Sequence, residues 1–195
     1  MKNILTTVVL FLGLFQSYGQ TLTYDDFKSL IPYLQTENWK SAFKESTKLL
    51  KSADKDTSEF HAIILYINIF SAAGMVTEGQ MTYKELENNV MKFQGRKIII
   101  SAHPVTIKDG ALRQIKFDVT DSTNAAFVAA TNSKGTYILC MEKFTFKDKI
   151  NLDDFPEKTI VRCGGTLEKI ETNPNKSMIW ILRLTVKDAF ARKAN

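Results

Sequence analysis

Histidine and cysteine are scarce in this chain, which has 2 His and 2 Cys among its 195 residues. A metal site would need His61, His103, Cys140 and Cys163 to converge, and their spacing matches no zinc-binding pattern. We therefore expect no metal and no cofactor.

Short motifs that would assign a reaction are also lacking. The sequence has no H-E-x-x-H, G-x-S-x-G, P-loop or dinucleotide fingerprint. Its densest acidic group, Asp153, Asp154 and Glu157, flanks Phe155-Pro156 in a polar connection. We interpret this group as a solvated loop face or a helix end rather than an acid–base pair. Catalysis is not excluded, but no motif argues for it.

Uncharged apolar runs are rare too, and the clearest one begins the chain. Lys2 precedes the uncharged run Ile4–Phe15, and Ser17 and Gly19 are small residues before Gln20. This order predicts a secretory signal peptide over residues 1–19. The apolar run is too short to be a membrane span, which needs about 20 apolar residues. We expect a chain exported to the periplasm or beyond the cell. No Cys lies near the cut, so a lipid-modified N-terminus is not expected.

Charge is distributed unevenly between the two halves. Residues 20–94 carry 8 Lys and 10 acidic residues, net −2, and residues 95–195 carry 17 Lys plus Arg and 11 acidic residues, net +6. A basic half favours an acidic partner such as a polysaccharide or an envelope protein. Nucleic acid is not the expected partner of an exported chain. The alternative is that the lysines only solubilise a sheet and protect its edges.

The segment from Tyr24 to Phe93 has helical periodicity. Pro32 should shorten, kink or interrupt the first helix, and Gly74 and Gly79 should bracket a break after the nearly all-apolar helix Phe60–Ala73. Thr82 and Glu85 form a capping box for the last helix. Two apolar faces are expected, one with Phe27, Leu30, Ile31 and Leu34, the other with Trp39, Ala42, Phe43, Leu49 and Leu50.

Helical hairpins of this size resemble tetratricopeptide repeats. Trp39 and Ala42 stand where that repeat places an aromatic and a small residue. The resemblance implies a helical region over residues 20–94 that offers a protein-docking surface.

Short strands are predicted from Gly95 onward. They cover Arg96–Ile107, Ile115–Val119, Ala125–Thr131, Thr136–Phe144, Thr159–Ile170 and Ser177–Val186. Asp109-Gly110 predicts a hairpin turn, Lys147–Glu157 a short helix, and Gly164-Gly165 a bulge or bend. The run Ser177–Val186 is apolar on both faces, so it should be a central strand.

Five or six strands with one helical insertion favour a small closed barrel, and three segments resemble a known one. They are Phe93–Ile98, Leu139-Cys140-Met141 and Val161–Leu167, which look like exported bacterial proteins with a tRNA-anticodon-binding-like OB domain. The resemblance implies an α+β chain with an OB-like barrel over residues 95–195. A cystatin- or NTF2-like curved sheet is the alternative.

Cys140 and Cys163 allow a disulfide in an oxidising compartment. The barrel opposes it, because the fifth strand would separate the third from the fourth, placing the two Cα atoms about 9.5 Å apart. Two buried thiols are then the alternative, and a catalytic thiol is a third.

OB barrels bind ligands on their second and third strands and adjoining loops. That face predicts a binding site made of Lys108, Lys116, Tyr137, Asn173, Asn175 and Lys176. Cations beside an aromatic suit an acidic ligand with a ring. We expect a non-enzymatic binding module of the cell envelope. The alternatives are a structural accessory protein that docks a partner through its helices, and a thiol-dependent enzyme.

Overall fold

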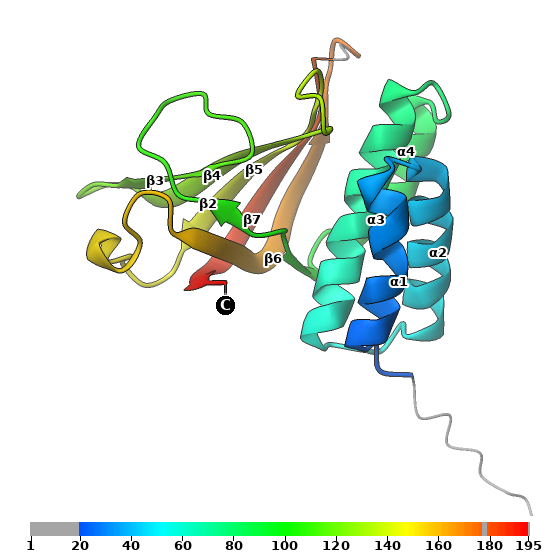
Figure 1. Cartoon of the computed structure of the whole chain (residues 1–195), viewed down its shortest axis with the longest axis horizontal. Coiled ribbons are helices and arrows are strands. Elements are labelled where there is room, and N and C mark those ends of the chain that lie inside the picture. The colour runs from blue at the N-terminus through cyan, green and yellow to red at the C-terminus, as the bar shows by residue number, and fades with distance from the viewer. Residues whose placement is uncertain (1–19, 177–178, 195) are drawn as a thin grey trace, which may run out of the picture.

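The protein is an α+β chain with a layer of four α-helices beside a mixed sheet of seven strands (Figure 1). A computed structural model describes residues 20–176 and 179–194. The predicted α+β class is confirmed. The predicted signal peptide and its cleavage site lie outside the described residues, as do Ser177, Met178 and Asn195.

The helices are α1 (Tyr24–Gln35), α2 (Trp39–Ser52), α3 (Glu59–Thr77) and α4 (Tyr83–Val90), followed by the 3-10 turn η1 (Met91–Phe93). Capping starts each α-helix, through the side chains of Thr23, Asn38, Ser58 and Thr82. The Thr82–Glu85 capping box is confirmed. Pro32 does not interrupt α1, which ends three residues later at Gln35.

The break expected between Gly74 and Gly79 is present, because α3 ends at Thr77, but the helix continues through Gly74 rather than ending at Ala73. A Cβ atom at position 74 would lie 2.6 Å from Trp39 Cγ, so this glycine lets the Trp39 indole pack against the backbone of α3. The helix ends before Gly79, whose φ is +68°. Glycine therefore has a packing role at one position and a terminating role at the other.

The strands are β1 (Lys97–Ile99), β2 (His103–Pro104), β3 (Ile115–Val119), β4 (Asn124–Thr131), β5 (Ile138–Phe146), β6 (Ile160–Thr172) and β7 (Trp180–Lys193). They are ordered β1-β6-β7-β5-β4-β3, with β2 also paired to β6. All pairs are antiparallel except β5 with β7. The strand from the apolar run at residues 177–186 is central, as predicted.

The expected closed barrel is not confirmed, because the sheet is open. Its two outer strands, β1 and β3, contain only three and five residues. Strands this short leave few backbone groups to pair across the gap between them. The hairpin predicted at Asp109-Gly110 is also wrong. β2 pairs with β6 and β3 pairs with β4, so the strands before and after this turn join different neighbours.

The bulge predicted at Gly164-Gly165 is confirmed by a register shift between β6 and β7 at Gly164/Thr166. Added Cβ atoms would lie 2.8 Å from the Ile98 carbonyl oxygen at Gly164 and 2.7 Å from the Lys187 carbonyl oxygen at Gly165. Close backbone approach therefore requires both glycines. The predicted helix over 147–157 is the 3-10 turn η2 (Leu152–Asp154).

Helix α3 joins the two layers, since it contacts α1, α2 and α4 as well as β1, β5 and β7 (Figure 1). It is the one described helix long and apolar enough to cross a membrane, by length and composition alone, and 78% of its most apolar window is buried. Its neighbours in the fold cover its apolar surface. One continuous core therefore runs from the helices into the sheet.

Candidate functional site

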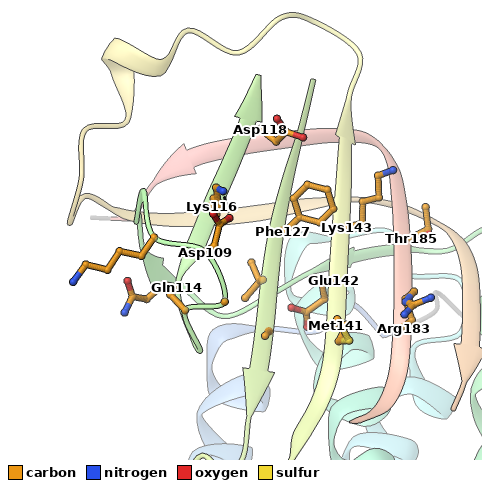
Figure 2. Close-up of a pocket in the computed structure, with 15 residues that line it drawn as sticks. Asp109, Gln114, Lys116, Asp118, Phe127, Met141, Glu142, Lys143, Arg183 and Thr185 are labelled. Atoms are coloured by element: carbon orange, nitrogen blue, oxygen red, sulfur yellow. Dashed lines mark hydrogen bonds and ion pairs between the residues drawn. The ribbon is translucent and has the colours of Figure 1, made fainter. Parts of the chain in front are cut away.

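A groove of about 540 Å³ crosses one face of the sheet (Figure 2). Side chains of β3, β4, β5 and β7 line it, together with residues 108–111 of the segment before β3. Its volume lies in the range of small-ligand sites.

Strand register places three contrasting side chains in a row across this groove. Lys116 of β3 is opposite Phe127 of β4, and Phe127 is opposite Lys143 of β5. Residues directly opposite one another in a sheet share a face. The Phe127 side chain is 39% exposed, and the Lys143 ammonium lies 5.9 Å from its ring centroid. The groove therefore presents an aromatic surface between two cations.

The next row, across β4, β5 and β7, consists of Ala129, Met141 and Arg183. Ala129 is small and leaves room beside Phe127. The Arg183 guanidinium lies 5.0 Å from the Trp180 ring centroid, which holds its charge at the side of the groove.

The four cations of the groove differ in how far they are neutralised. Lys116 forms an ion pair with Asp109 (Figure 2). Lys143 has no acidic partner within 4 Å among the described residues, and neither has Lys108. Lys143 is therefore the cation best placed to receive an anionic group beside Phe127.

The predicted binding residues separate into two groups. Lys108 and Lys116 line the groove. Tyr137, Asn173, Asn175 and Lys176 lie at one end of the sheet, where Ile138 of β5 pairs with Trp180 of β7. Buried Asn173 has a turn-forming role there, because its side chain donates to the Trp180 carbonyl at 3.0 Å and accepts from the Asn175 amide at 3.0 Å.

Sequence analysis missed Phe127, Met141, Lys143, Arg183 and Thr185, which also line the groove. Phe127 and Lys143 could have been found from the alternation of buried and exposed positions along β4 and β5, because both are exposed between buried neighbours. Only the register between the strands shows that they are adjacent.

One of the residues that line the groove, Glu142 of β5, carries a buried carboxyl group. Glu142 is 2% exposed, and the Tyr66 hydroxyl donates to its Oε1 atom at 2.6 Å. Its Oε2 atom has no hydrogen-bond partner in the described structure. Burial raises the pKa of Glu142 from its ordinary value near 4.5 to about 8, although the Tyr66 hydrogen bond opposes the rise.

Cys140 and Cys163 are free and buried, on strands separated by β7. The structure thus has the buried-thiol alternative rather than the disulfide. Burial, with a smaller effect of the Glu142 charge, raises the pKa of Cys140 and brings that of Cys163 to about 12. Neither group supplies a thiolate at neutral pH.

The remaining candidates for chemistry are dispersed. Among the described residues, no three His, Cys, Asp or Glu side chains are grouped so that they could hold a metal ion. His103 is buried and bonded through Nδ1 to the Arg113 carbonyl at 3.1 Å. Asp153, Asp154 and Glu157 are exposed in the connection around η2. Comparison with protein families, with characterised proteins and with solved structures finds no match to this chain.

Proposed function

We propose that the chain is an exported binding module that holds an acidic polysaccharide in the sheet groove. The observation that carries the proposal is the cross-strand row of Lys116, Phe127 and Lys143. A sugar ring lying on the exposed face of Phe127 would place its acidic groups beside the lysines on both sides. Binding of this kind needs no nucleophile and no metal.

The distribution of charge supports an acidic ligand over a neutral one. Four cations and three carboxylates line the groove, but one carboxylate, Asp109, is paired with Lys116, and another, Glu142, is buried with a raised pKa. The field that a ligand meets there is therefore positive.

We also propose that the sheet is an opened form of the OB strand path. β7 lies between β5 and β6, as the fifth strand of such a barrel lies between the third and fourth. The two edges of the sheet, β1 and β3, come from one stretch of chain, and Val105 bridges to Ile115 between them. This supports reading β1, β2 and β3 as one interrupted first strand, with the groove on the face where OB barrels bind ligands.

Isothermal titration calorimetry with an oligogalacturonate tests the function. An uncharged dextran oligomer of similar length and single-stranded oligothymidylate are the comparison ligands. We expect binding of the oligogalacturonate that weakens between 50 and 300 mM salt. Phe127→Ala should weaken it about tenfold through the lost stacking surface, and Lys143→Gln about threefold. Lys134→Gln, at an exposed loop lysine, is the matched control and should leave affinity unchanged.

Other outcomes would redirect the assignment. Equal affinity for dextran would show that the charges are not used. Tighter binding of oligothymidylate would indicate a nucleic-acid module. Loss of affinity in Lys134→Gln equal to that in Lys143→Gln would indicate attraction by net charge rather than by the groove. No binding of any probe would overturn the proposal and favour the helix-docking accessory role.

A further inference from the structure

A second hollow, of about 360 Å³, lies in the helical layer, away from the sheet groove. It is formed between α2, α3 and the segment that leads from η1 into β1. Its apolar walls are Phe43, Leu50, Leu65 and Phe93. Three cations border it, Lys51, Lys92 and Arg96, against a single carboxylate, Asp54. The hollow therefore has an excess of two positive charges, one of them supplied by Arg96 from the start of the basic half.

The polar groups inside this hollow are oriented by the fold. The Arg96 guanidinium donates through Nη2 to the His61 Nε2 atom at 3.3 Å and to the Asp54 carbonyl at 3.2 Å. A guanidinium has no acceptor, so Nε2 must be the unprotonated nitrogen of His61 and Nδ1 must carry the hydrogen. Desolvation and the Arg96 charge lower the pKa of His61, which keeps the ring neutral in this tautomer.

Two hydrogen-bonding atoms are left over. His61 Nδ1 has no protein acceptor among the described residues and is not among their buried atoms that lack a partner, so it is open to solvent in a residue that lines the hollow. The Asn68 side-chain nitrogen donates to Thr47 Oγ1 at 2.8 Å and to Ser46 Oγ at 3.0 Å, which fixes the orientation of the amide. No described residue donates a hydrogen bond to its Oδ1 atom. His61, Leu65 and Asn68 share one face of α3, so both groups border the same hollow.

We propose that this hollow is a second binding site, for a small organic anion with a compact apolar body. The apolar walls would cover the body, while Lys51, Lys92 and Arg96 attract the acidic group and His61 donates to it. Its place between the helices and the start of β1 makes it independent of the sheet groove. A result that overturned the polysaccharide proposal would therefore not overturn this one.

The test uses 1-naphthoate as the probe, followed by calorimetry and by amide chemical shifts. The neutral 1-naphthamide has the same body without the charge, and acetate has the charge without the body. We expect naphthoate to bind at least fivefold more tightly than naphthamide and acetate not to bind. Shifts should concentrate in α2, α3 and residues 92–96. The double variant Lys51→Gln/Lys92→Gln should weaken naphthoate about fivefold.

Two further variants separate this site from general attraction. Lys40→Gln removes an exposed lysine of α2 that does not border the hollow, and it should leave affinity unchanged. Thr47→Trp places a large ring at the exposed rim and should abolish binding while the protein stays folded. Equal binding of naphthoate and naphthamide, equal losses in the Lys40 and Lys51/Lys92 variants, or full binding by Thr47→Trp would each overturn the proposal.

Discussion

At the scale of single residues, the pair Tyr66 and Glu142 is the most constrained feature of the core. A carboxyl group is buried between α3 and β5, and a tyrosine hydroxyl satisfies only one of its oxygens. Such a group is accommodated more easily when it is protonated. The hydrogen bond between helix and sheet is therefore coupled to pH.

Glu142 should make the free energy of unfolding fall as pH rises. Its folded pKa of about 8 is above its ordinary value of 4.5, so the folded state holds the proton more tightly than the unfolded state. The resulting stability is complete below about pH 4.5 and is lost as pH rises through 8, a change of about 5 kcal/mol. Urea unfolding of the protein and of Glu142→Gln between pH 5 and 9 measures this slope, which the variant should largely lack.

Tyr66→Phe is the matched substitution on the helix side. It should destabilise the protein by about 1–3 kcal/mol at pH 6, because it leaves Glu142 Oε1 without its hydrogen bond. A variant as stable as the parent would show that the hydroxyl contributes nothing to folding.

At the scale of elements, the contact between α2 and α3 depends on one missing side chain. Trp39 is buried against the α3 backbone at Gly74, and its ring centroid lies 5.7 Å from that of Phe70. Helix propensity alone would favour alanine at position 74 by about 1 kcal/mol. The contact with Trp39 opposes that preference.

Gly74→Ala should lower the free energy of unfolding by about 1–3 kcal/mol, because the added methyl group forces the Trp39 indole away from α3. Ser71→Ala, three residues away in the same helix, is the control. It removes a buried hydroxyl that lacks a partner, so it should be neutral or stabilising. Denaturant unfolding measures both. A stabilised Gly74→Ala would mean that helix propensity outweighs the contact.

The elements also show what a sequence can predict. Local patterns located the capping box at Thr82, the bulge at Gly164 and the central strand after residue 176, because each depends on neighbouring residues. The helix expected to end at Ala73 continues through Gly74, because the reason for that glycine, Trp39, lies 35 positions away. The hairpin at Asp109-Gly110 was wrong because pairing with β6 and β4 decided the strands' partners. Most of the sheet groove was missed for the same reason, since cross-strand register brings Lys143 to Phe127.

At the scale of the whole molecule, the helices and the sheet share one core. Helix α3 packs on both layers, and Glu59 at its start forms ion pairs with Arg162 of β6 and Arg192 of β7. The sequence suggested a boundary near residue 94, but contacts cross it at several points.

The two layers should therefore unfold together. The chain has 2 Trp, of which Trp39 reports on the helices and Trp180 on the sheet. In Trp39→Phe, the fluorescence of Trp180, which reports on the sheet, and the far-ultraviolet circular dichroism of the helices should give the same urea midpoint. Separate midpoints would mean that residues 20–94 and 95–194 are independent domains.

The parallel seam between β5 and β7 sets an order of assembly. The β3-β4-β5 meander can form from short loops as soon as it is synthesised, whereas β6 pairs with β1 only across the whole intervening meander. β7 follows all of these described strands in the chain, and it pairs with β5 in parallel and with β6 antiparallel. Parallel pairing of distant segments is slow because chain entropy is lost before the contacts form. Until residues 180–193 have been synthesised, the edges of β5 and β6 that β7 will cover are open, and open strand edges favour aggregation of the nascent chain.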